Sequence, residues 1–139
     1  MKSIFVLFTS LLIGGGGIVN EQLLRAFNEQ FPKAQQVAWK ESVDNYAVDF
    51  VEDGVRSHIV YRKDGAFISS IRYYQERTLP YYLLNVLKKR YTGKTIFSVT
   101  ETSTVSGIEY FVKLEDSRVW LTVRIDSEGN PEVVEKYRK

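Results

Sequence analysis

The chain has 139 residues, which is enough for one domain with a substantial core and too few for two independent domains of ordinary size. Its formal net charge is only +2 and its acidic and basic residues are interspersed, so it lacks the basic stripe that is typical of a nucleic-acid-binding protein. The absence of cysteine excludes disulfides, thiolate metal ligands, thiol nucleophiles and the acylated cysteine that anchors a bacterial lipoprotein.

The N-terminal residues have the order of a secretory signal peptide. Lys2 supplies a positive charge, residues 4–13 are almost wholly apolar, and four glycines follow at 14–17. The apolar stretch is shorter than the roughly 20 residues that a membrane-spanning helix needs. We therefore predict a signal peptide over about residues 1–19 and a mature protein that is periplasmic or secreted, with no stable membrane anchor. The alternative is a buried first strand.

An amphipathic helix is expected directly after this segment. Asn20 is a favourable helix cap, and Leu23, Phe27 and Phe31 recur at the four-residue spacing of one helix face. Pro32 should end the helix. Alternating apolar residues then predict strands, with Asp53-Gly54 as a two-residue hairpin turn. The expected strands cover residues 37–39, 46–50, 55–61 and 66–74.

The same order of elements is expected to restart near residue 78. Pro80 suits a first helical turn, Leu83, Leu87 and Tyr91 repeat the four-residue spacing, and Gly93 should stop the helix. The expected strands are residues 96–100, 110–114 and 119–125, with a last short strand starting at residue 133.

The two halves of the chain align with each other. The apolar residues of the first half have counterparts 60 positions later up to the first strand, and 64 positions later from the second strand onward. The four additional residues are expected in a hairpin loop around residues 102–107, where an insertion costs little. The first group of pairs is Phe27 with Leu87, Phe31 with Tyr91, Val37 with Phe97, and Trp39 with Val99. The second is Tyr46 with Tyr110, Val48 with Val112, Phe50 with Leu114, and Gly65 with Gly129.

This pattern predicts an α+β fold of two tandem repeats, residues 20–77 and 78–139, each with one helix packed on an antiparallel sheet of three to four strands. One such repeat leaves long exposed strand edges. We therefore expect the two to lie side by side in an extended sheet, with both helices on one face and the other face open.

Short motifs of the mature chain resemble those of the PepSY-like and β-lactamase-inhibitor-protein-like (BLIP-like) domains of exported bacterial proteins, many from Bacteroidetes. The motifs are Phe31-Pro32-x-Ala34, Val37-x-Trp39, Tyr46-x-Val48-x-Phe50, Asp64-Gly65 and Leu79-Pro80. The resemblance covers about residues 20–139 and implies a tandem α+β fold and an envelope location. It identifies no inhibitory residue in this chain.

Catalytic chemistry is sparsely represented. His58 is the only histidine, and a turn at Asp53-Gly54 would place it across from Asp49 on the sheet face opposite Val48 and Ile59. This pair is half of a nucleophilic triad, but no serine elbow accompanies it, and further metal ligands do not cluster nearby. The chain also has several aspartates and glutamates close together in sequence, but these fall mainly at the expected hairpin ends, where acidic residues favour turns. We predict no catalytic residue, no metal site and no cofactor.

Aromatic residues carry the strongest indication of binding. Aromatics make up 14% of the chain, and nine of them are tyrosines. Adjacent strand residues point to opposite faces, so at least one of Tyr73 and Tyr74 should face outward. Exposed tyrosines beside arginines are typical of protein and peptide contact surfaces. The alternative is that these tyrosines seal the junction between the repeats. The predicted binding residues are Arg72, Tyr73, Tyr74, Tyr81 and Tyr82.

The sequence therefore predicts a non-catalytic exported binding module that holds a protein or peptide, an inhibitor being one such case. A second hypothesis is a small-molecule binder or enzyme of the cystatin-like α+β type, with a pocket between helix and sheet. A third is a structural component of the envelope. A flat aromatic sheet face would favour the first, and a deep polar pocket around His58 or the carboxylates would favour the second.

Overall fold

The computed structural model describes residues 19–139, in which no helix is long and apolar enough to span a membrane. Residues 1–18 of the predicted signal peptide lie outside the described residues. The described chain has an α+β fold with two α-helices and eight β-strands. It divides into two compact units, the first ending at Ile71 and the second running from Arg72 to Lys139. The boundary therefore falls within a strand, slightly before the predicted start of the second repeat at residue 78.

Unit 1 contains one α-helix and four strands that neighbour each other in sequence order. Strand β4 crosses the unit boundary, so its last three residues belong to unit 2. The elements are α2 (Glu21–Gln30), β1 (Gln35–Glu41), β2 (Asn45–Glu52), β3 (Val55–Arg62) and β4 (Phe67–Tyr74).

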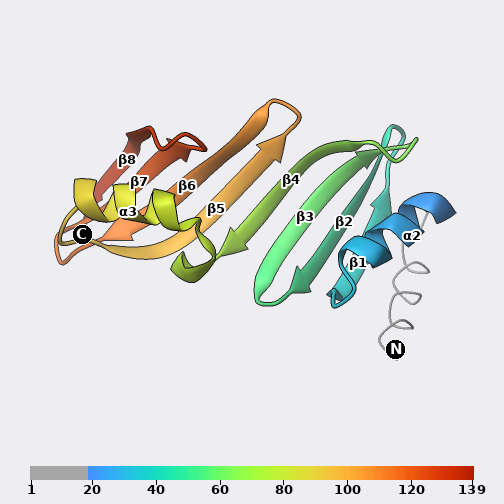
Figure 1. Ribbon diagram of the computed structural model, residues 1–139, viewed down its shortest axis with the longest axis horizontal. Helices are drawn as coiled ribbons and strands as arrows, with labels where there is room; N and C mark the ends of the chain where they lie inside the picture. The colour runs from blue at the N-terminus through green and yellow to red at the C-terminus, as the bar shows by residue number, and fades with distance from the viewer. Residues whose placement is uncertain (1–18) are drawn as a thin grey trace. The chain divides into compact units, whose positions relative to one another are not determined.

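Helix α2 begins and ends where the sequence predicts. The Asn20 side-chain oxygen accepts hydrogen bonds from the backbone N–H groups of Gln22 at 2.8 Å and Leu23 at 3.2 Å, which satisfies two free donors of the first turn. The helix lies across the sheet of unit 1 (Figure 1), and its buried Phe27 makes edge-on ring contacts with Trp39 of β1 and Phe50 of β2. Aromatic rings thus stand at the centre of the contacts between the helix and the sheet in this unit.

The hairpin of β2 and β3 has the predicted register. Its turn residues Asp53 and Gly54 have φ angles of 52° and 80°, a left-handed conformation that glycine adopts readily. Val48 lies opposite Ile59 on the buried face, and Asp49 lies opposite His58 on the other face. Because one face is buried, a one-residue shift would expose the whole apolar set, and this fixes the pairing.

Unit 2 follows with a short 3₁₀ turn, one helix and four strands in sequence order. The ribbon shows α3 crossing the strands of this unit (Figure 1), and Leu83 and Leu87 of that helix are fully buried. The elements are η1 (Glu76–Thr78), α3 (Tyr81–Arg90), β5 (Thr95–Thr104), β6 (Gly107–Glu115), β7 (Val119–Asp126) and β8 (Pro131–Arg138).

The prediction for the additional residues of the second half is wrong in one respect. The stretch 102–107 is not a loop, because β5 continues to Thr104 and β6 starts at Gly107, leaving only Val105 and Ser106 in the turn. Thr100, Thr102 and Thr104 favour a strand, so the insertion lengthens a paired hairpin. Strand β8 is likewise longer than the few residues predicted.

Candidate binding surface

The sheet of unit 2 has one buried and one open face. Alternate residues of the central strands are buried, among them Val112 and Leu114 of β6 and Val123 and Ile125 of β7. The residues between them point to the other side of the sheet, because successive strand side chains alternate. We call that side the open face of unit 2. Its positions on β6 and β7 are Glu109, Phe111, Lys113, Glu115, Trp120, Thr122, Arg124 and Asp126.

Three aromatic side chains cross the open face in a row. Phe97 of β5 and Trp120 of β7 make an edge-on contact with ring centroids 5.1 Å apart. Tyr137 of β8 lies directly opposite Trp120 in the strand pairing. Phe97 and Tyr137 are 52% and 58% exposed, and Trp120 is half-buried. Together they present a large apolar area to solvent, and we call them the aromatic row.

A β-bulge places Phe97 in this row. The pairing of β5 with β6 shifts between Ile96 and Ser98, so Phe97 has no direct partner and turns to the open face. In unit 1 the bulge of β1 has a different conformation. Gln36 there has a positive φ of 56°, and the next residue, Val37, is buried. The two bulges thus send aligned residues to opposite faces.

Two lysines flank the aromatic row. The ammonium group of Lys139 lies 4.7 Å from the Trp120 ring centroid and also forms an ion pair with Glu115 at 2.6 Å. The ammonium group of Lys113 lies 5.8 Å from the same ring. Both distances allow cation–π attraction, which holds the lysines beside the indole.

The structure distributes the five predicted binding residues over different surfaces. Tyr74 is buried and Tyr73 is 46% exposed, as alternation along β4 requires. Tyr73 therefore shares the open face, whereas Arg72 and Tyr74 point to the helix-covered face. Tyr81 and Tyr82 are exposed on the first turn of α3. The five residues do not form one continuous surface.

Arg72 and Tyr74 belong to a largely buried polar network. Arg72 donates from Nη1 to both carboxylate oxygens of Glu101 at 3.2 and 3.1 Å, and the Tyr74 hydroxyl donates to the same carboxylate at 2.6 Å. Glu101 itself is only 7% exposed. Burial, followed by the hydrogen bond to Glu101, raises the pKa of Tyr74 well above its ordinary value. Burial also raises the pKa of the neighbouring Tyr110, and the charge of Glu101 adds to that shift.

The predicted His58–Asp49 pair is present, with 2.8 Å between Nδ1 and the carboxylate oxygen. Both side chains are substantially exposed, at 39% and 63%. In unit 2 the aligned cross-strand pair is Lys113 and Thr122. Within residues 19–139, no group of three or more histidine and acidic side chains is arranged to hold a metal ion.

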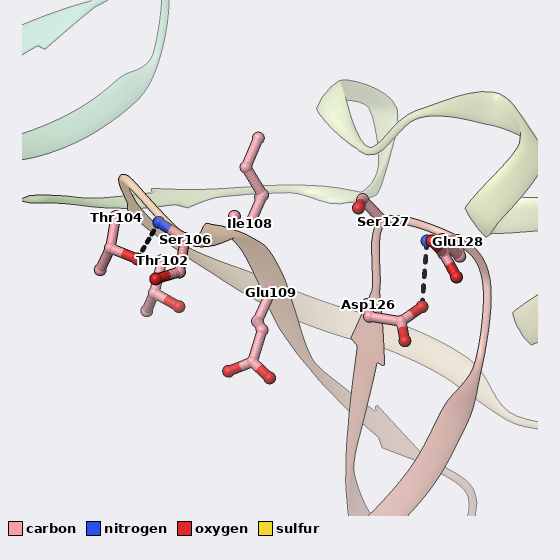
Figure 2. Close-up of a pocket in the computed structure, with 9 residues that line it drawn as sticks. Thr102, Thr104, Ser106, Ile108, Glu109, Asp126, Ser127 and Glu128 are labelled. Atoms are coloured by element: carbon pink, nitrogen blue, oxygen red, sulfur yellow. Dashed lines mark hydrogen bonds between the residues drawn. The ribbon is translucent and has the colours of Figure 1, made fainter.

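A depression of about 420 Å³, lined by hydroxyl and carboxylate groups, lies beside the turn of the long β5–β6 hairpin (Figure 2). Ile108 and Glu109, as neighbours on β6, point to different sides in this view. Asp126 accepts hydrogen bonds from the backbone N–H and the side-chain amide of Asn130 and from the backbone N–H of Glu128, and these lower its pKa. That carboxylate therefore holds a turn, so the depression carries no organised chemical site.

Sequence reasoning missed the aromatic row. Neither Phe97 nor Trp120 is among the predicted binding residues, and the alignment of the two halves pairs Phe97 with Val37, which is buried. The alternation along β7 contains the signal for Trp120. Leu121, Val123 and Ile125 are buried, so Trp120, one position before Leu121, points to the opposite face of the sheet. The bulge that turns Phe97 outward has no comparable signal in the sequence.

No protein-family model matches the chain, and no curated protein matches its sequence. Solved structures nevertheless share its fold. A BLIP-like protein from Bacteroides fragilis NCTC 9343 is 16% identical over 89% of each chain, with a TM-score of 0.59. A candidate periplasmic protein from Bacteroides eggerthii DSM 20697 is 15% identical over 88% of this chain and 90% of that one, with a TM-score of 0.57.

A DUF2874 family protein from Bacteroides ovatus ATCC 8483 is 15% identical over 88% of this chain and 89% of that one, with a TM-score of 0.58. The resemblance to BLIP-like proteins that the motifs indicate is therefore confirmed at the level of fold.

Proposed function

We propose that the chain is a non-catalytic exported binding module that holds a protein or peptide against the open face of unit 2. The observation that carries this proposal is the aromatic row. Phe97 and Tyr137 are 52% and 58% exposed, and both lie beside the half-buried Trp120. A contiguous apolar patch exposed on a small protein marks an interaction site, whereas apolar residues exposed singly do not.

The chemistry of the open face fits a partner of this class. Tryptophan, tyrosine and phenylalanine are enriched in protein interfaces, and a few such residues supply most of the binding free energy. Trp120 is a suitable anchor because its ring is already held by Phe97 and by the two lysines. Little side-chain freedom is then lost when a partner packs on it.

We also propose that the two units are copies of one repeat that have diverged on their outward positions. Each unit has a helix followed by four strands. Glu41 pairs with Tyr46 in unit 1, and the residues aligned with them, Glu101 and Tyr110, pair in unit 2. This conserved register of a buried or half-buried acid beside a tyrosine supports a common origin more strongly than apolar periodicity does.

Two observations support export. The N-terminal segment has the order of a signal peptide, and one protein of the same fold is a candidate periplasmic protein. Mass spectrometry of the protein recovered from its native envelope or medium tests this proposal. A mature chain that still carried residues 1–17 would contradict it.

The alternative of a pocket between helix and sheet has less support. In unit 1 that space is filled by buried side chains, among them Phe27, Trp39 and Phe50. The described cavities lie at turns instead: beside the β5–β6 turn, around residues 32–36 after α2, and beside residues 43–45.

Site-specific photo-crosslinking in native envelope extract would test the binding function. A photoreactive residue at Thr122 samples the open face of unit 2, and the same residue at His58 samples the aligned position of unit 1 as a matched control. We expect a protein adduct from position 122 that disappears with Trp120→Ala. Adducts of equal yield from both positions, or none from position 122, would refute the proposal.

The five residues predicted from the sequence enter the same experiment. Alanine at Tyr73 should lower the adduct yield, because its side chain shares the open face. Alanine at Tyr81 or Tyr82 tests whether the contact extends to α3. Alanine at Arg72 or Tyr74 should mainly lower the free energy of unfolding, because both side chains hold Glu101.

A further inference from the structure

Strand β8 lies at the end of the strand order, so within the described residues it pairs on one side only, with β7. Its residues after Pro131 are all exposed. A strand that ends a sheet presents unpaired backbone N–H and C=O groups, and another chain can pair with them. The outer edge of β8 is therefore a position at which a further strand can be added.

The hydrogen bonds between β7 and β8 show which backbone groups face this edge. The Lys139 N–H donates to the Arg118 carbonyl at 2.8 Å, so these two residues form a hydrogen-bonded pair. Along an antiparallel ladder such pairs alternate with pairs whose N–H and C=O groups point away from each other. Tyr137 therefore bonds to β7, whereas the backbone N–H and C=O groups of Lys136 and Arg138 point to the outer edge.

The side chains of Lys136 and Arg138 lie on the helix-covered side of the sheet, because their partners in β7 are Leu121 and Val119. Both are exposed, and neither forms an ion pair with a carboxylate of residues 19–139. Helix α3 and the positions of β7 and β8 that face it contain no acidic residue. The edge therefore carries two positive charges without a carboxylate partner, in contrast to the open face, where carboxylates outnumber cations.

An ion pair within unit 2 shows what such a cation binds when a further strand is present. Arg72 in β4 lies 64 positions before Lys136, which is the interval at which the two halves of the chain align over these strands. The Arg72 Nη1 donates to both carboxylate oxygens of Glu101 in β5, at 3.2 and 3.1 Å. Strand β5 follows β4 in the strand order, whereas none of the described strands follows β8. Lys136 thus lacks the acidic residue of a next strand that its counterpart has.

We propose that β8 binds an extended segment of a partner protein as an additional strand, with acidic side chains beside Lys136 and Arg138 and an apolar side chain beside Tyr137. This inference rests on the proposed binding function and specifies how the partner is held. Alternate residues of a strand reach opposite faces, so one segment can pair with the cations on the helix-covered side and extend the aromatic row on the open face. In strand addition the backbone hydrogen bonds supply affinity and the alternate side chains supply specificity.

A second copy of this chain fits the edge less well. Antiparallel pairing of β8 with another β8 through the outward groups of Lys136 and Arg138 places Lys136 opposite Lys136, Lys136 opposite Arg138, or Arg138 opposite Arg138. Like charges directly opposite each other destabilise a strand pair. Val134, the extra residue of a β-bulge, interrupts the edge before these positions. The charge pattern therefore favours a segment of another protein.

Amide hydrogen exchange measured by NMR reports on this contact residue by residue. The probes are three synthetic peptides: one of alternating glutamate and valine, a second with lysine for each glutamate, and a third with the composition of the first but with its glutamates and valines in separate blocks. At saturation we expect only the alternating acidic peptide to slow exchange at Lys136 and Arg138, by about tenfold or more, because an added strand bonds their N–H groups. The N–H of Tyr137, which already bonds to β7, serves as the internal reference.

Lys136→Pro is the first test variant, because proline removes an outward N–H and is tolerated at the edge of a sheet. Lys136→Thr is its control, since it removes the same charge and keeps the N–H. Lys136→Glu tests the charge pairing. Its matched control is Lys40→Glu, the same charge change on an exposed residue of the edge strand β1 in unit 1.

We expect Lys136→Pro to lose the acidic peptide and Lys136→Thr to retain measurable binding. Lys136→Glu should weaken binding about tenfold, because it sets like charges against each other, and Lys40→Glu should leave it unchanged. If Lys136→Pro fails to fold, Lys136→Glu carries the test. Unchanged exchange at Lys136 with all three peptides, equal protection by the acidic and basic peptides, or an unchanged affinity in Lys136→Glu would each overturn the proposal. If the crosslinked adduct at position 122 still forms in that case, the binding function stands and only strand addition is refuted.

Discussion

Removal of the Tyr74 hydroxyl tests whether the Arg72–Glu101–Tyr74 network is structural. Tyr74→Phe keeps the buried ring, which is 5% exposed, and deletes only the hydrogen bond of 2.6 Å to Glu101. Hydrogen bonds to charged groups contribute about 1.5–3 kcal/mol. Because Glu101 keeps both contacts with Arg72, we expect a loss near the lower end, about 2 kcal/mol of unfolding free energy.

Replacement of the carboxylate itself should cost more. Glu101→Ala removes the partner of Arg72 and of Tyr74 at once, and breaking a buried ion pair in this way costs about 3–5 kcal/mol. The Arg72 side chain is 38% exposed and can still reach water, so we expect about 3 kcal/mol. The double variant Tyr74→Phe/Glu101→Ala should lose less unfolding free energy than the sum of the two single losses, because both substitutions remove the same hydrogen bond.

Urea unfolding followed by tryptophan fluorescence measures these losses, and its pH dependence gives a second check. Burial raises the pKa of Tyr74 above its unfolded value of about 10. Above pH 10 the unfolded tyrosine loses its proton while the folded one retains it. The stabilisation is therefore complete below pH 10 and declines as pH rises further, by up to about 1.4 kcal/mol per pH unit.

Tyr74→Phe should remove this share of the alkaline decline, and the raised pKa values of Tyr61 and Tyr110 should leave a smaller one. A variant whose unfolding free energy at neutral pH lies within about 0.5 kcal/mol of the wild type would show that the hydroxyl gains nothing from Glu101. A decline above pH 10 as steep as that of the wild type would contradict the raised pKa.

Three further outcomes follow from the structure. His58→Ala should leave both the melting temperature and the crosslinked adduct nearly unchanged, because its exposed pair with Asp49 lacks a triad partner among the described residues; loss of the adduct with an unchanged melting curve would reveal a missed site. Gly65→Ala should cost about 1 kcal/mol in urea unfolding, because φ is +94° there and no atom lies near the added methyl; a gain in stability would contradict this. The Lys94 ammonium and two backbone N–H groups lower the pKa of Asp116, so the stabilisation that the Asp116 carboxylate contributes is present above about pH 4 and lost as pH falls. In Asp116→Asn the unfolding free energy should therefore fall less steeply at acid pH.

Local rules account for most of the fold that the sequence predicts. The Asn20 cap and the Asp53-Gly54 turn depend only on neighbouring residues, so their positions could be found by inspection. The turn then fixed the Asp49–His58 register, because antiparallel pairing propagates from it residue by residue. Strand ends were less accurate where polar threonines and serines continue a strand beyond its apolar part, as in β5.

The candidate binding surface was harder to predict because it depends on long-range register. Tyr73 and Tyr74 are adjacent in the chain, yet one is exposed and the other is bound to Glu101, 27 residues away. The contact of Phe97 with Trp120 requires both a bulge in β5 and the pairing of three strands. Composition indicated that aromatics matter, but it could not say which of them reach the same face.

The contrast between the units suggests how such a surface can arise on this fold. Inward positions of a strand are constrained by packing, since a large change in a close-packed core costs several kcal/mol. Outward positions carry no such constraint, and alternation separates the two sets completely. Val48 and Val112 are both fully buried, whereas their outward neighbours differ: Asp49 pairs with His58, and Lys113 lies beside Trp120. A sheet of this kind can therefore carry a charged aromatic surface on its outward positions without disturbing its core.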